Sequence, residues 1–113
     1  MAQELAEARR RDPNAAPFPE ELVNIIGYDH LQSGNVTHAL EVFRLNVDAF
    51  PNSPNAYDSL ADAYLEAGQK DQARLNAQKA LDLLPSATGI PQGFRDTIRQ
   101  SAEQKLKQLG EPR

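Results

Sequence analysis

The sequence contains no cysteine, which excludes disulfide bonds and thiolate metal sites. It has no apolar run near the roughly 20 residues that a membrane-spanning helix needs. Residues 1–12 also lack the apolar core of a signal peptide. Positive charge is not in excess, because 12 lysines and arginines face 16 aspartates and glutamates. We therefore expect one compact soluble domain that neither binds nucleic acid nor inserts into a membrane, with the cytoplasm slightly favoured as its compartment.

The usual signatures of enzyme and cofactor chemistry are missing as well. The glycines are scattered and form no phosphate-binding loop, and Ser33 lacks the glycine pattern of a nucleophile elbow. His30 and His38 have no metal-ligand spacing, so we expect His30 to be a partly buried imidazole with satisfied hydrogen bonds. Asp58 and Asp62 pair at i, i+4, but acid–base catalysis would also need a pocket. We predict that the protein is not an enzyme and binds no metal or cofactor.

The sequence does contain an internal repeat, because shifting the chain by 34 residues superimposes its landmarks: Gly34 on Gly68, Ala39 on Ala73 and Pro51 on Pro85. Apolar residues recur with these landmarks at helical spacing, which predicts helices near 20–33, 36–50, 54–67 and 70–84. Gly34 and Gly68 are suited to end the first helix of each unit. We expect Asn35 to cap the helix that follows Gly34, and Ser53 and Pro54 to begin the third helix.

These landmarks resemble those of the tetratricopeptide repeat (TPR) family. The first unit has the signature residues Ile26, Gly27, Ala39, Phe43 and Pro51, and the second has Tyr57, Leu60, Ala61, Tyr64, Ala73, Ala77, Ala80 and Pro85. The resemblance covers residues 20 to 85 and implies an all-α, TPR-like superhelix of two helix hairpins, residues 20–53 and 54–87.

Two repeats leave open faces that the chain ends must cover. Residues 88–113 are predicted to form a capping helix, because its apolar residues follow helical spacing: Phe94, Ile98, Ala102, Leu106 and Leu109. Residues 1–19 form a helix and linker in either of two interpretations. One is a half-repeat, since Leu5, Ala8 and Pro13 are spaced as Phe43, Asn46 and Pro51 are. The other is a frayed helix followed by a proline-rich linker.

The resemblance also implies where a ligand would bind, because in this family the first helix of each hairpin lines the concave face. The corresponding positions are Asn24, Tyr28, Leu31, Asn55, Asp58, Asp62 and Leu65. The acidic residues among them favour a neutral or basic extended peptide, whose backbone the asparagines could bond. The competing interpretation is a solvated acidic face without a ligand.

A narrower resemblance concerns residues 43 to 73, which are similar to the repeat pair at the C-terminal end of some bacterial serine hydrolases of the esterase and β-lactamase-like kinds. No hydrolase residues accompany it, so no activity is implied. The sequence thus favours a scaffold for protein binding. The rival hypothesis is a structural or oligomerisation unit, such as a homodimer or an appendage of a larger hydrolase.

Overall fold

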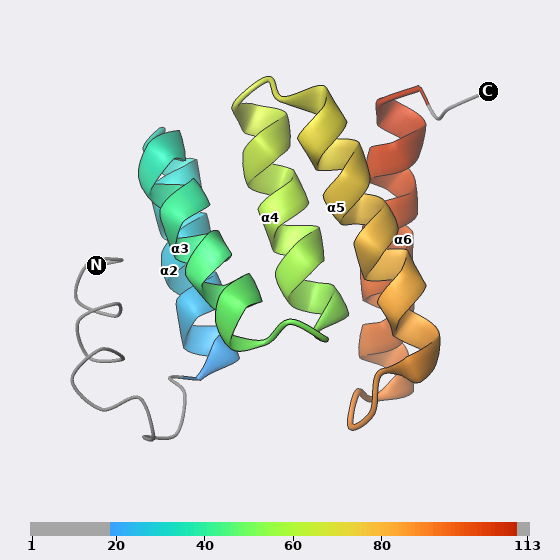
Figure 1. Cartoon of the computed structure of the whole chain (residues 1–113). Helices are drawn as coiled ribbons and strands as arrows, with labels where there is room; N and C mark the ends of the chain where they lie inside the picture. Colours follow the sequence, from blue (N-terminus) through green and yellow to red (C-terminus); the bar gives the residue numbers. More distant parts are fainter. Residues whose placement is uncertain (1–18, 111–113) are drawn as a thin grey trace.

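The computed structural model describes residues 19–110, which form five α-helices and one short 3-10 turn (Figure 1). In chain order the elements are α2 (Glu20–Gln32), α3 (Val36–Ala49), α4 (Pro54–Glu66), α5 (Lys70–Leu83), the 3-10 turn η1 (Leu84–Ser86) and α6 (Gln92–Gln108). No strand occurs between residues 19 and 110, so the prediction of an all-helical protein is confirmed for this part of the chain. The four predicted ranges agree with α2 to α5 to within one residue. The predicted half-repeat at Leu5, Ala8 and Pro13 lies outside the described residues.

The turn after the first helix of each hairpin is built on a glycine. Gly34 has a φ of 82° and Gly68 a φ of 75°, a left-handed conformation in which a Cβ would be strained. This conformation lets the N–H of Asn35 turn back and donate to the carbonyl oxygen of His30 at 2.8 Å. Asn35 therefore acts through its backbone. The prediction that its side chain caps α3 is wrong, because that side chain makes no capping hydrogen bond.

The start of α4 follows the prediction. The Ser53 hydroxyl accepts a hydrogen bond from the Ala56 N–H at 3.3 Å, and Pro54 is the first helical residue. The same hydroxyl donates to Oε2 of Glu20 at 2.5 Å. Because Glu20 begins α2, this bond ties the start of one hairpin to the start of the next.

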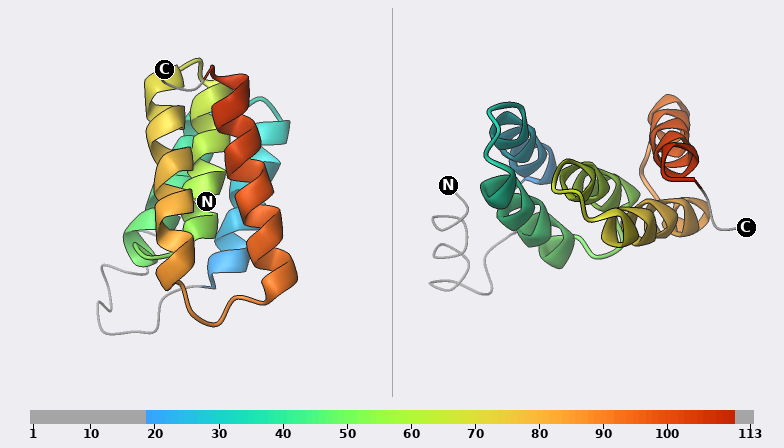
Figure 2. Two further views of the ribbon diagram at one scale, coloured as in Figure 1. Left: turned by 90° about the vertical axis from the view of Figure 1, so that its right-hand side faces the viewer. Right: turned by 90° about the horizontal axis from the view of Figure 1, so that it is seen from above.

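The five helices form two layers. Each helix packs against the next along the chain, and α4 also contacts both α2 and α6. Seen from above, α2, α4 and α6 form one layer, and α3 and α5 the other (Figure 2). The two hairpins repeat at the same offset, since α2 and α4 begin at residues 20 and 54, and α3 and α5 at residues 36 and 70. We call the solvent-facing side of α2, α4 and α6 the even-helix surface.

The hairpins fill the same core position with different pairs of side chains. In the first hairpin, a Cβ added to Gly27 would lie 2.3 Å from Cε1 of Phe43, so only glycine leaves room for the ring. The equivalent residues in the second hairpin are Ala61 and Ala77, which are both fully buried. The second hairpin thus fills this position with two small side chains instead of a glycine beside a large ring.

The last helix, α6, closes the array against the second hairpin. Ala102 and Leu106 pack in one cluster with alanines of α4 and α5: Ala61, Ala77 and Ala80. The Arg95 guanidinium donates to the carbonyl oxygens of Leu84, at 2.5 Å, and of Ala87. It thereby fastens the preceding loop to α6. Although α6 has 17 residues, neither it nor any other helix between residues 19 and 110 is long and apolar enough to cross a membrane.

Candidate functional site

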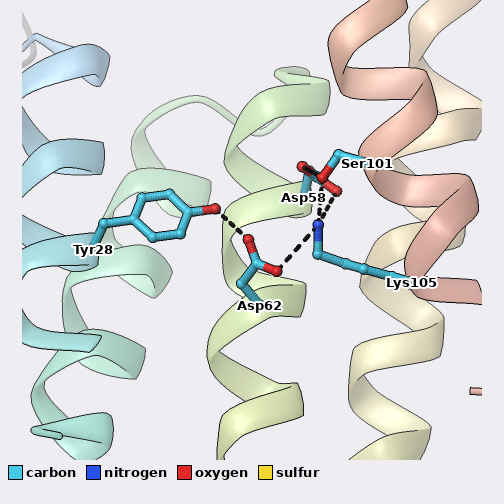
Figure 3. Close-up of polar contacts among 5 residues, drawn as sticks. All are labelled: Tyr28, Asp58, Asp62, Ser101 and Lys105. Atoms are coloured by element: carbon cyan, nitrogen blue, oxygen red, sulfur yellow. Dashed lines mark hydrogen bonds and ion pairs between the residues drawn. The ribbon is translucent and has the colours of Figure 1, made fainter. Parts of the chain in front are cut away.

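The most connected polar cluster in the described residues joins the three helices of the even-helix layer. It consists of Tyr28 on α2, Asp58 and Asp62 on α4, and Ser101 and Lys105 on α6 (Figure 3). Because α2, α4 and α6 come from separate parts of the chain, the cluster forms only when all three are packed together. We call these five residues the Lys105 cluster.

The ammonium group of Lys105 is the centre of this cluster. Its Nζ lies 2.8 Å from Oδ1 of Asp58, 3.2 Å from Oδ1 of Asp62 and 2.6 Å from Oγ of Ser101. Ser101 donates its own proton to Oδ2 of Asp58 at 2.7 Å, and the Tyr28 hydroxyl donates to Oδ2 of Asp62. Lys105 therefore donates hydrogen bonds to Asp58 and Ser101 and forms an ion pair with Asp62, while Asp58 accepts from two donors and Asp62 from Tyr28.

Burial strengthens these contacts, and it also means that each charged group needs its partner. The side chains of Lys105 and Asp58 are only 7% and 8% exposed, whereas that of Asp62 is 30% exposed. Burial raises the pKa of Asp58, and Lys105 and Ser101 counteract that rise by holding the charged form. Burial, with a contribution from Asp62, also raises the pKa of Tyr28 well above its ordinary value of 10.0. Tyr28 is therefore a hydrogen-bond donor across the neutral pH range.

The geometry of the cluster favours a structural role, in which it holds three helices together, over a catalytic one. A serine and a lysine at 2.6 Å could suggest an activated nucleophile, but the amine would have to be neutral to act as a base. Lys105 is ion-paired with two carboxylates, and the Ser101 proton is directed at Asp58 rather than at the amine. What the five residues do together is fix the spacing of α2, α4 and α6.

The residues predicted to line the ligand face do not all lie open to solvent. Asp58 is buried, at 5% exposed, and paired with α6, so the expectation that it points outward is wrong. The hydroxyl of Tyr28 is engaged by Asp62, and Tyr28, Leu31 and Leu65 pack partly against the core. The two predicted asparagines, Asn24 and Asn55, are half-buried on α2 and α4.

Asn24 differs from the other predicted contact residues because its amide oxygen is unpaired. Its Oδ1 is buried without a hydrogen-bond partner among residues 19–110. An unpaired buried acceptor is unfavourable, and a donor from a bound chain could satisfy it only if the side chain turned outward.

Sequence reasoning missed Lys105 and Ser101. A signal was present, because Lys105 lies seven residues after Ile98 and one residue before Leu106, within the apolar face of α6. A lysine in such a position can bury its aliphatic stem but needs a partner for its charge. The i, i+4 carboxylates Asp58 and Asp62 are that partner.

The two histidines lie together at the turn between α2 and α3. His30 stacks on His38 with ring centroids 5.4 Å apart. Nε2 of His30 is buried without a hydrogen-bond partner from the described residues, so the expectation of a satisfied imidazole is wrong for that atom. No group of three or more potential metal ligands occurs in the part of the chain that the structure describes.

A hollow of about 670 Å³ lies at one end of the helices, away from the Lys105 cluster. It is lined by the start of α2, the turn before α4 and the loop before α6: Glu20, Phe50, Pro51, Asn52, Ser53, Pro54, Ser86, Ala87, Thr88 and Ile90. Backbone turns form most of this lining, and none of its residues belongs to the predicted ligand face.

Comparisons with known proteins give this site no counterpart. No protein-family model matches the chain, and no curated protein matches it significantly. Its function must therefore be argued from its own residues.

Proposed function

We propose that this protein is an interaction scaffold that binds a peptide or protein segment on its even-helix surface. The observation that carries the proposal is the recurrence of two helix hairpins at a 34-residue offset, with the same glycine turn and with the first helix of each in one layer. Together with the repeat signature, this recurrence supports a TPR-like superhelix. Stacked hairpins present one helix from each unit side by side, and the resulting extended surface suits a chain-like ligand.

The Lys105 cluster supports the proposal by making this surface rigid. It links α2 to α4 through Tyr28 and Asp62, and α4 to α6 through Lys105. A surface whose helices are already fixed loses less conformational entropy when a ligand binds. We therefore assign Tyr28, Asp58 and Asp62 a positioning role, and contact with the ligand to their more exposed neighbours.

The charge of the surface favours a neutral or basic ligand. Lys105 compensates one of the two carboxylates in its cluster, and Glu21 and Glu66 are exposed acidic residues on the same helices. An acidic ligand would be repelled by this balance, whereas a basic one would be attracted. Asn55, and Asn24 if its side chain turns outward, could donate to and accept from an extended backbone, and Leu65 could pack an apolar side chain.

A random peptide library presented to the full-length protein tests this proposal. Bound peptides should be enriched in lysine and arginine and depleted of aspartate and glutamate. Their affinities should then be measured for Glu66→Lys on the even-helix surface and for Glu41→Lys, which reverses an exposed charge on α3 in the other layer. We expect Glu66→Lys to weaken binding by roughly tenfold and Glu41→Lys to change it little.

Two results would contradict the proposal. One is a selected set of peptides without a charge preference, or with an acidic one. The other is equal weakening by Glu66→Lys and Glu41→Lys, which would indicate attraction by overall charge rather than binding at the even-helix surface.

A further inference from the structure

The outer face of α2 is apolar and exposed, whereas the same face of α4 is covered. Leu22 and Ile25 are 50% and 65% exposed. Their equivalents 34 residues later are Ala56 and Ser59, which are 0% and 1% exposed. We call the face of α2 that carries Leu22 and Ile25 the leading face.

The helix that covers this face of α4 shows which kind of neighbour α2 lacks. α4 contacts α3 and α2 of the preceding hairpin, and Ala63 of α4 lies in one buried cluster with Ala39 and Phe43 of α3. α2 begins the described residues, so it has no preceding hairpin there. Two large apolar side chains stand where α4 has small ones, and this difference favours an occupant that buries them.

Residues 1–18 have the sequence of such an occupant. Leu5, Ala8 and Pro13 are spaced as Phe43, Asn46 and Pro51, which are the inward residues and the terminating proline of α3. Met1 extends the pattern to i, i+4 and i+7, which places Met1, Leu5 and Ala8 on one face of a helix. The segment directly precedes α2, so it can reach the leading face without a long loop.

The leading face could be covered by this segment or by a second copy of the protein, and charge distinguishes the two candidates. Glu21 and Asp29 are exposed acidic residues of α2, and Asp29 lies on the leading face itself, at the position that corresponds to Ala63 of α4. Two copies meeting symmetrically through this face would bring these acids together, because the same patch faces itself in a twofold interface. Residues 1–13 instead balance Arg9, Arg10 and Arg11 against Glu4, Glu7 and Asp12, so their side chains carry no net charge. A segment without net charge avoids the repulsion that a second acidic copy would bring, and this favours the segment.

We propose that residues 1–13 form a helix that docks within the same chain on Leu22 and Ile25 of α2. The docked helix lies on the side of α2 that corresponds to the side of α4 covered by α3. This inference does not rest on the proposed ligand, because Leu22 and Ile25 lie on a face of α2 beside the even-helix surface and belong to neither that surface nor the Lys105 cluster.

The absence of tryptophan from the sequence allows a direct test in the full-length chain. Leu22→Trp places a fluorescent probe on the leading face, and Leu75→Trp places a matched probe on α5, where the replaced leucine is 64% exposed. Each variant is also made with Leu5→Glu, which puts a charge on the proposed contact stripe. Gln3→Glu adds the same charge to the segment off that stripe and serves as its control.

We expect the Leu22→Trp variant to emit at shorter wavelength than the Leu75→Trp variant and to be quenched less by acrylamide. Adding Leu5→Glu should remove both differences, and adding Gln3→Glu should not. Light scattering on the same samples should give the mass of a monomer. Equal quenching of the two probes, or no response to Leu5→Glu, would overturn the proposal. A dimer that Leu5→Glu dissociates would also overturn it, since the segment would then dock on another copy.

Discussion

Replacing Lys105 by methionine tests the physical account of the central cluster. Methionine keeps most of the volume of the lysine stem but removes the charge and all three donors. Asp58 would remain in a site where its side chain is 8% exposed, with Ser101 as its remaining donor. Asp62 would be less affected, because it is 30% exposed and keeps its bond from Tyr28.

The expected loss of stability is set mainly by Asp58, because it is more deeply buried than Asp62. Removing one partner of a buried ion pair costs about 3–5 kcal/mol, because an uncompensated charge stays buried. Ser101 still donates to Asp58 and offsets part of this cost, so we expect a loss of about 3 kcal/mol in the free energy of unfolding. That loss is a large fraction of the roughly 5–15 kcal/mol that stabilises a typical domain. With a urea m-value of about 1.5 kcal/mol/M, the unfolding midpoint would fall by about 2 M.

The pH dependence has a defined sign. Lys105 lowers the pKa of Asp58 against the effect of burial, so its removal raises that pKa further. The cost of Lys105→Met should be fully present at pH values above this raised pKa. It should shrink as the pH falls through it, because the protonated carboxyl carries no charge to leave unpaired.

Urea unfolding followed by circular dichroism measures these effects. Lys107→Met on the same helix is the matched control, because Lys107 is exposed and should change stability by less than about 0.5 kcal/mol. The double variant Asp58→Asn/Lys105→Met should be more stable than Lys105→Met alone, since it removes the unpaired charge. Equal effects of Lys105→Met and Lys107→Met would refute the reasoning. So would a double variant less stable than the single one.

Two further predictions concern α2. Tyr28→Phe should lower the free energy of unfolding by about 1–2 kcal/mol through loss of the bond to Asp62. The folded pKa of Tyr28 lies above 10.0, so its contribution to the free energy of unfolding is complete below pH 10.0 and is lost as the pH rises further. The stability of the Phe variant should therefore fall less steeply with pH in the alkaline range. Identical pH dependences of the two proteins would contradict this. Gly27→Ala should cost about 1–3 kcal/mol, because its Cβ would meet the Phe43 ring. Thermal unfolding should show that Gly27→Ala/Phe43→Ala loses less than the sum of the single changes, and simple additivity would argue against the clash.

Local signals predicted the helices well. The glycine turns at Gly34 and Gly68 and the Ser53–Pro54 start are short-range features, and they placed α2 to α5 to within one residue. The C-terminal helix was also predicted, because the apolar spacing from Phe94 to Leu109 is regular. Each of these predictions depended on residues within a few turns of one another.

The candidate site was harder to predict because it depends on distant residues. Asp58 and Lys105 are 47 positions apart, and their pairing is set by how α6 packs on α4. Helical spacing alone predicts that Asp58 lies on the ligand face, whereas the packing of α6 buries it. Periodicity gives the face of a helix on which a residue lies, but not which other helix covers that face.

The central claim is that a ligand binds across α2, α4 and α6. The most direct measurement is a two-dimensional NMR titration of the full-length protein with a basic peptide selected from the random library. We predict that the largest amide shifts fall on the even-helix surface, around Asn24, Asn55, Leu65 and Glu66, and that α3 and α5 change little. Shifts concentrated on α3 and α5, or in the hollow around Phe50 and Ile90, would contradict the account.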